Sequence, residues 1–434
     1  MEAKTRAIYK DDFTEYLLCL ALDVGEGMLK NGGEVARVED TIERICRAYG
    51  AEHVEVFTIV SMINAAIRMP DGSYSSQLRR VKQTGNNLGM LESLNALSRE
   101  ICATTPALDS FDEKLHSLKR TPVYPAWLEM ISSAVGAAAF CLFFGGKMLD
   151  SVVTFIIGLM IYGVNNYTSR RLNSMAKTVL SSFVAATVAA LLSLIVPDLE
   201  VDYIIIGAIM LLVPGLIFGT ALRDLFCGDL IAGTLKVLQA LLQTLMIAFG
   251  YMLTYAILGN ALISAKASDS GEQFAIQIIT GVVASVAFAI VFKSNKRHLL
   301  ATAICGFLTF AVYYLTFLLV DSLFWAAFVS SVISATFCEI NARVRRAPAI
   351  VVLMPAVISI VPGGYLYRSA RDIVKGSVVS GISELGAAAA IALGLAGGIV
   401  TASIMFLIVS DWVKKIKNNN NANKNSQNKT YCAK

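Results

Sequence analysis

The chain has 434 residues, of which 56% are hydrophobic and only 16% are charged. Because soluble domains usually carry about 25% charged residues, this composition excludes an ordinary soluble protein and favours one that spans a membrane. The formal net charge of +5 is what basic loops and a basic tail would produce, so we expect no nucleic-acid partner.

The chain shows no pattern that is typical of an enzyme, a metal site or a cofactor site. Its 8 cysteines form no CxxC pair, and its 3 histidines, His53, His116 and His298, are far apart in the sequence. No P-loop is present, which gives no support to ATP-driven transport. No Ser-His-Asp or Cys-His group can be assembled around these histidines. We therefore predict no enzyme activity, no catalytic residues, no metal and no cofactor.

Residues 1–122 hold most of the acidic groups and predict a small cytoplasmic α+β domain. A helical stripe through Leu17, Ala21, Val24 and Met28 should end at Asn31-Gly32-Gly33, because this triplet is a strong helix stop. A second helix should carry Val35, Val38, Ile42 and Ile45 on its apolar face, and the i,i+4 pairs Asp40–Arg44 and Glu43–Arg47 on its other face. Strands are expected at 53–60, 62–68 and 74–81. A third helix should pass through Leu91, Leu94, Leu97 and Ile101. Thr121-Pro122 and Pro125 should separate this domain from the first apolar run.

Ten apolar runs occupy the rest of the chain, and most of them approach the ~20 residues that a helix needs to cross about 30 Å of hydrocarbon. The expected spans are 126–145, 149–168, 176–196, 203–222, 230–259, 274–292, 299–320, 323–341, 349–366 and 384–410. They divide into two five-helix halves, 126–259 and 274–410. The tail, 411–434, is rich in Asn and Lys, and its low complexity predicts disorder.

The basic residues of the loops predict the orientation of the spans, because cytoplasmic loops carry an excess of Lys and Arg. With the N-terminus and the C-terminus in the cytoplasm, the inside loops carry Arg170, Arg171, Lys177, Lys293, Lys296, Arg297, Arg343, Arg345 and Arg346, and the outside loops carry only Lys147 and Lys266. One segment does not follow this charge distribution, because its basic residues would face outward; they are Arg368, Arg371 and Lys375. We interpret this exception as a segment that lines a cavity.

A motif occurs twice at a spacing of 148 residues. Pro214-Gly215, Arg223-Asp224, Gly228 and Gly233 recur as Pro362-Gly363, Arg371-Asp372, Gly376 and Gly381. Since each half has an odd number of spans, the second copy should enter the membrane from the opposite side. This pattern is typical of transporters with an inverted repeat.

The two prolines should break the fourth and ninth spans, because proline lacks an N–H donor and clashes with the preceding turn. A break at membrane depth is tolerated where the backbone lines a polar cavity. Freed carbonyls and helix ends can then hold the carboxylate and the ammonium group of a small metabolite. The candidate substrate-binding residues are Pro214, Gly215, Pro362, Gly363 and Gly364.

Ionisable groups near the membrane give candidates for coupling transport to protons. They are Arg223, Asp224, Arg371, Asp372 and Glu384, the last of which should begin the final span. Lys236, Gln239 and Gln243 add a polar stripe to the fifth span. A purely structural ion pair at the helix end explains Arg223 and Asp224 equally well.

The run from Gly25 to Glu39, GEGMLKNGGEVARVE, resembles the N-terminal signature of the threonine/serine exporter family, through Gly25, Gly32, Arg37 and Glu39. The resemblance extends over both halves, which are separate proteins in some relatives. It implies proton-driven export of threonine and serine across the bacterial inner membrane, with the substrate, protons and the bilayer as partners. A homo-oligomer is compatible with it.

Alternatives remain open at this point. Split relatives are associated with succinate, so a dicarboxylate exporter is one. A membrane-anchored enzyme or sensor that acts through the N-terminal domain is another. Arg37 and Glu39 fit a solvated, salt-bridged helix face as well as they fit a ligand site.

Overall fold

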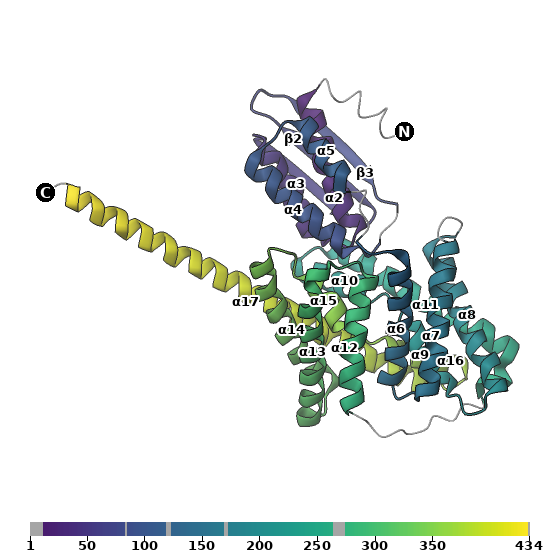
Figure 1. Ribbon diagram of the computed structural model, residues 1–434. Helices are drawn as coiled ribbons and strands as arrows, with labels where there is room; N and C mark the ends of the chain where they lie inside the picture. Colours follow the sequence, from purple (N-terminus) through teal and green to yellow (C-terminus); the bar gives the residue numbers. More distant parts are fainter. Residues whose placement is uncertain (1–11, 83–84, 119–122, 169–171, 264–273, 433–434) are drawn as a thin grey trace.

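The computed structural model describes residues 12–82, 85–118, 123–168, 172–263 and 274–432. A small α+β domain lies at one end of a bundle of apolar helices (Figure 1). We call this end of the bundle the domain end and the opposite end the far end. The predicted linker residues Thr121-Pro122 and the loop bases Arg170, Arg171 and Lys266 lie outside the described residues.

The N-terminal domain agrees with the α+β prediction. Its elements are α2 (Phe13–Lys30), α3 (Val35–Ala48), β1 (His53–Ile59), β2 (Met62–Arg68), β3 (Tyr74–Arg80), α4 (Leu88–Thr104) and α5 (Leu108–Leu118). The three strands form an antiparallel sheet in the order β1-β2-β3. The short helix α5 was not predicted; it packs against α4 and α2 through Phe111 and Leu115, which are fully buried.

Local sequence explains the helices of this domain. The Asp12 side chain caps α2 by accepting hydrogen bonds from the backbone N–H groups of Thr14 and Glu15. The helix ends at Asn31 as predicted, and Gly32 follows with φ of +89°. The two predicted pairs on α3, Asp40–Arg44 and Glu43–Arg47, both close at 2.7 Å.

Eight helices in the described part of the chain are long and apolar enough to cross a membrane. They are α6 (Ala126–Phe143), α7 (Met148–Thr168), α8 (Ser174–Ile195), α11 (Leu230–Ile263), α12 (Phe274–Val291), α13 (Leu299–Val320, preceded by the short η1, Lys296–His298), α14 (Leu323–Arg345) and α17 (Val378–Cys432). A ninth candidate is a pair of helices bent by 43°. We predicted about ten spans, with the fourth and the ninth broken; the described residues give eight or nine candidates, and a polytopic helical membrane protein is confirmed.

The difference lies in the two runs that contain the repeated prolines. The predicted span 203–222 is divided into α9 (Val201–Ile209) and α10 (Gly215–Cys227). The predicted span 349–366 is divided into α15 (Ile350–Val357), η2 (Ile358–Ile360) and α16 (Gly363–Val374). The expected breaks at Pro214 and Pro362 are confirmed, and they explain why neither run forms one continuous helix.

The last helix differs from the prediction at both ends. α17 begins at Val378, so Glu384 lies inside the helix and not at its start. The helix continues to Cys432, where composition predicts a disordered tail, and Figure 1 shows it projecting away from the bundle. The segment from Asp411 to Cys432 contains neither Pro nor Gly, so nothing in it interrupts the helical hydrogen-bond pattern. The domain limits themselves remain a prediction.

Candidate functional site: two broken helices and a cavity

The two breaks have the same backbone geometry. Pro214 caps α10 with φ −77° and ψ 50°, and Pro362 caps α16 with φ −76° and ψ 37°. Just after each proline, the glycine N–H donates to the residue before the proline, from Gly215 to Val213 O (2.8 Å) and from Gly363 to Val361 O (2.7 Å). The second helix of each pair therefore begins at the proline, whose missing N–H costs nothing at a helix start.

The two breaks pack directly against each other. A Cβ atom at Gly215 would lie 3.2 Å from Ile358 Cδ1 and 3.5 Å from Val361, and a Cβ at Gly363 would lie 2.7 Å from Met210 Sδ and 2.9 Å from Val213. The spacing of 148 residues relates each member of one contact to its counterpart in the other. Gly215 and Gly363 thus allow a close, reciprocal crossing of the two broken helices.

The ends of the half-helices also match. Gly228 is the C-cap of α10, and Gly376 follows Lys375, the C-cap of α16; their φ values of +98° and +87° lie in a left-handed conformation that glycine adopts without strain. The long helix that comes next then packs back onto its half-helix, with Gly233 against Leu225 and Gly381 against Ile373. The two glycine turns and the two contacts again sit at equivalent positions.

The charges of the first copy lie at the domain end. Arg223 donates to Glu34 of the N-terminal domain, with Nη1 2.7 Å from Oε1. Asp224 pairs instead with Lys236 of α11 at 2.5 Å, and both of these side chains are buried. In place of the Arg223–Asp224 pair that the sequence left open as an alternative, two separate ion pairs hold α10 to different neighbours.

The charges of the second copy lie at the far end, where Figure 1 places α9 and α16. Arg371 contacts Asp202 of α9 at 2.9 Å and its own neighbour Asp372 at 2.8 Å. Arg368 pairs with Glu384 of α17 at 3.3 Å. The arginines of the segment that violates the loop-charge pattern are thus neutralised by acids, which lowers the cost of placing them there.

A cavity of about 940 Å³ lies between the two halves beside the second break. Pro362, Gly364, Ser359 and Arg368 line it from the second half, and Lys147 and Phe144 line it from the first. Lys147 follows the end of α6 and Leu323 begins α14, so these lining residues place the mouth of the cavity at the far end. The size is that of a site for a small molecule.

Polar groups converge on this cavity. Gln277, Thr280, Tyr313 and Tyr365 line it together with Ser359. The Ser359 hydroxyl is buried and has no hydrogen-bond partner among the described residues. An unpaired buried hydroxyl is costly, so it marks a place where a ligand or a water would be favoured.

The first break is closed where the second is open. Gln243 of the predicted polar stripe donates from Nε2 to the carbonyl of Leu212 at 2.9 Å, which satisfies a backbone group near the first break. The equivalent position in α17 is Ile391, which has no polar side chain, and the equivalent of Leu212 is Ile360. Both of these residues line the cavity. Of the candidate substrate-binding residues, Pro362 and Gly364 therefore lie at the cavity, whereas Gly215 and Gly363 pack at the crossing.

The signature residues of the N-terminal domain have local roles. Gly25 allows close packing of α2 on α3, because a Cβ there would lie 2.5 Å from Ile42 Cδ1. Glu39 accepts a hydrogen bond from the Thr58 N–H at 2.7 Å, and Arg37 lies 3.7 Å from Glu34. Sequence reasoning missed Glu34, although it lies inside the signature run.

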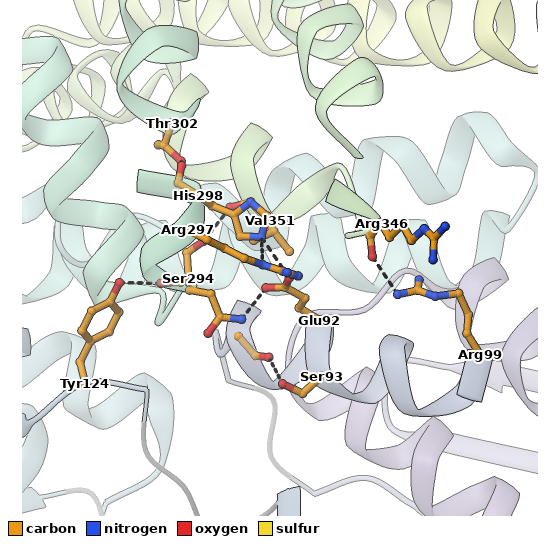
Figure 2. Close-up of polar contacts among 12 residues, drawn as sticks. Glu92, Ser93, Arg99, Tyr124, Ser294, Arg297, His298, Thr302, Arg346 and Val351 are labelled. Carbon is orange, nitrogen blue, oxygen red and sulfur yellow. Dashed lines mark hydrogen bonds and ion pairs between the residues drawn. The ribbon is translucent and has the colours of Figure 1, made fainter. Parts of the chain in front are cut away.

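A second group of contacts ties the N-terminal domain to the second half (Figure 2). Glu92 of α4 is buried and contacts Asn295, Arg297 and His298 next to the start of α13. Arg99 donates to the Arg346 carbonyl at 2.7 Å. The domain therefore contacts both halves of the bundle. In the part of the chain that the structure describes, no cluster of His, Cys, Asp or Glu could hold a metal.

Two family models match the sequence. The ThrE model of threonine/serine exporters matches residues 19–258, and a further threonine/serine exporter model, ThrE_2, matches residues 277–405. The first match alone covers more than half of the chain. The chain belongs to the threonine/serine exporter family.

The individual proteins that resemble this chain are distant from it. The threonine/serine exporter of Corynebacterium glutamicum is 23% identical over 88% of this chain and 80% of its own length. The "Probable succinate transporter subunit YjjP" of Klebsiella aerogenes is 28% identical over 54% of this chain and 90% of its own length. Pheromone-regulated membrane protein 10 of Debaryomyces hansenii is 23% identical over 66% of this chain and 30% of its own length. No solved structure matches the chain significantly.

Proposed function

We propose that this protein is a secondary transporter, not an enzyme, which exports threonine and serine across a bacterial plasma membrane. The observation that carries the proposal is the cavity beside the second broken helix, which is lined by both halves and has an unpaired hydroxyl at Ser359. Membership of the exporter family and the relative named a threonine/serine exporter support the choice of substrate.

The charges around the cavity suit a zwitterion. Arg368 lines the cavity and forms an ion pair with Glu384, with 3.3 Å between Arg368 Nε and Glu384 Oε2. Lys147 also lines the cavity, and it forms an ion pair with Glu200 at 2.9 Å. Each base that lines the cavity thus has an acid beside it, and we propose that these two signs bind the carboxylate and the ammonium group of the substrate. The Ser359 hydroxyl offers a hydrogen bond to the substrate hydroxyl.

Transport requires access from both sides in turn, and we propose that the two halves form an inverted repeat for this purpose. The reciprocal crossing of Gly215 and Gly363 supports this arrangement. So does the placement of Arg223 against the N-terminal domain and of Arg371 against Asp202. In this conformation, the cavity opens at the far end and the N-terminal domain covers the domain end. With that domain and both termini in the cytoplasm, the conformation faces outward.

We assign proton coupling to the repeated carboxylates, Asp224 and Asp372, with Glu384 as a further candidate. Asp224 is paired with Lys236 and Asp372 with Arg371, and we propose that each carboxylate leaves its cation for a less polar site as the gates move. A carboxylate that leaves its cation and enters an apolar site takes up a proton more readily.

Succinate is the competing substrate, because a relative of the first half carries a succinate transporter name. A dicarboxylate would need two bases without acids beside them, and the acids next to Arg368 and Lys147 disfavour it. A membrane-anchored enzyme or sensor gives no reason for two matched broken helices.

Counterflow into proteoliposomes tests the proposal. Vesicles loaded with unlabelled threonine should accumulate labelled threonine and serine, and succinate should accumulate much less. Arg368→Gln should reduce the accumulation, whereas Arg343→Gln, which removes an exposed arginine of α14, serves as the matched control. If only succinate accumulated, the substrate would be a dicarboxylate and not threonine or serine. If none of the three compounds accumulated, the proposal that the protein is a transporter of these compounds would be refuted.

A further inference from the structure

The two repeated arginines have acidic partners that come from different parts of the chain. Arg371 of α16 contacts Asp202, which belongs to α9 of the opposite half. Arg223 of α10 contacts Glu34, which belongs to the N-terminal domain and lies 189 residues away. The two copies of the motif therefore differ in the partner of the repeated arginine: in the second copy it comes from the opposite half, and in the first copy it comes from the N-terminal domain.

The repeat identifies the residue that would be the equivalent partner of Arg223. Position 202 of the first half corresponds to position 350 of the second, where the sequence has Ile350. The packing agrees with this assignment. A Cβ at Gly219 of α10 would lie 3.0 Å from Met354 of α15. These two helices run in opposite directions. One turn after Gly219 is Arg223, and one turn before Met354 is Ile350, so these two residues come near each other.

We propose that Glu34 is a gate residue, supplied by the N-terminal domain in place of the acid that the second half lacks at Ile350. At the far end, the Asp202–Arg371 pair joins the two halves to each other. At the domain end, an apolar residue cannot pair with Arg223, and the domain closes the gap with its own carboxylate. The N-terminal domain is therefore a working part of the inner gate.

The environment of Glu34 supports this role. Its carboxyl is buried and is surrounded by Arg37 from its own domain, Arg223 from α10 and Lys236 from α11, with Asp224 also nearby. A carboxylate buried among three cations is held in its charged form, so it can act as a fixed partner. The same domain also contacts the second half through Glu92 and Arg99. It can therefore hold both halves together when the inner side is closed.

The inference rests on the proposed transport function, and thiol labelling tests it without relying on any substrate. Thr220 is buried in α10 and is the equivalent of Arg368, which lines the outer cavity. In a background whose native cysteines are replaced, Thr220→Cys should be protected from an impermeant thiol reagent on the cytoplasmic side. Glu34→Gln should increase the labelling rate several-fold. Glu43→Gln, which removes a partly exposed acid of the same domain, should leave the rate unchanged.

A rescue variant separates a gate from a merely structural contact. In the Glu34→Gln background, Ile350→Asp should restore protection, because it returns the missing acid to the second half. Ile350→Asn has a similar size and no charge, and it should fail to restore it. If Glu34→Gln does not insert, Arg223→Gln removes the other partner and must give the same exposure.

Two results would overturn the inference: unchanged labelling in Glu34→Gln, or rescue by Asn as complete as rescue by Asp. Counterflow by the parent protein is measured in parallel. Absence of counterflow together with the expected labelling would refute the transport function and not the gate. Normal counterflow together with unchanged labelling in Glu34→Gln would refute the gate alone.

Discussion

Lys236 and Glu384 occupy equivalent positions of the two long helices that come after the half-helices, yet they carry opposite charges. Each closes an ion pair with the half-helix before it, Lys236 with Asp224 at 2.5 Å and Glu384 with Arg368 at 3.3 Å. The two pairs differ in burial, because the side chains of the first are at most 9% exposed and those of the second are 26–28% exposed. In both halves an ion pair joins the long helix to the half-helix before it, but the charge that each helix contributes is reversed.

This difference predicts unequal effects on stability. Lys236→Met should lower the free energy of unfolding by ~3–5 kcal/mol, because it leaves Asp224 buried without its cation. Glu384→Gln should cost no more than ~1 kcal/mol, because the Arg368–Glu384 pair is partly solvated. Thermal unfolding in detergent measures both changes. The double variant Lys236→Met/Asp224→Leu should recover much of the loss, and the same melting temperature for both single variants would contradict the prediction.

The prolines at the two breaks should matter for transport more than for folding. Pro214→Ala and Pro362→Ala should each insert normally and transport more slowly, because a helix that runs on through the break covers carbonyls that the substrate needs. Pro197→Ala, in the connection between α8 and α9, is the control for effects on expression. Transport at the parent's rate by both break variants would reduce these prolines to structural kinks.

The contact of the N-terminal domain with the bundle should depend on pH in a defined direction. Burial raises the pKa of the Glu34 carboxyl, but the charges of Arg223, Arg37 and Lys236 outweigh it, and the net pKa lies below the ordinary value of 4.5. A lowered pKa stabilises the contact fully above pH 4.5, and this stabilisation is lost as the pH falls through the lowered value.

Hydrogen exchange of α3 and α10, corrected for the intrinsic pH dependence of exchange, measures this contact. Protection should be constant from about pH 7 to about pH 5 and should fall below pH 4.5. Glu39 acts in the opposite sense, because its burial raises its pKa. Glu34→Gln is therefore the control: it should remove the loss of protection in acid. A parent protein that gains protection in acid would show that Glu34 does not govern the contact.

The repeated carboxylates should connect transport to the proton gradient. Asp224→Asn or Asp372→Asn should abolish the response of substrate efflux to an imposed pH gradient while substrate exchange at equal pH continues. The reason is that an amide keeps the hydrogen-bonding shape of the carboxyl but cannot carry a proton. Efflux from proteoliposomes with and without the gradient measures this. If both variants respond as the parent does, Glu384 becomes the residue to change next.

The sequence predicted features that depend on local chemistry. The breaks at Pro214 and Pro362 follow from the backbone of proline itself, and the end of α2 follows from Asn31-Gly32-Gly33. The i,i+4 pairs on α3 depend only on helical spacing. Each of these could be predicted because the cause lies within a few residues of the effect.

Features that depend on distant contacts could not be predicted. The partners of Arg223 and Asp224 depend on how the N-terminal domain and α11 pack against α10, and adjacent residues in the sequence turned out to hold different neighbours. The cavity at Ser359 forms where both halves meet. The helical continuation of α17 to Cys432 differs from the predicted disorder, because an Asn- and Lys-rich segment without Pro or Gly can continue a helix that is already formed.

The central claim is that the two copies of the motif face opposite sides of the membrane, and one labelling measurement tests it directly. Leu230 and Val378 are equivalent, exposed residues at the starts of α11 and α17. In the cysteine-free background, Leu230→Cys should react with an impermeant thiol reagent only from the cytoplasmic side. Val378→Cys should react only from the outside. Labelling of both positions from the same side would contradict the inverted arrangement, and with it the view that the Glu34–Arg223 and Asp202–Arg371 pairs serve opposite gates.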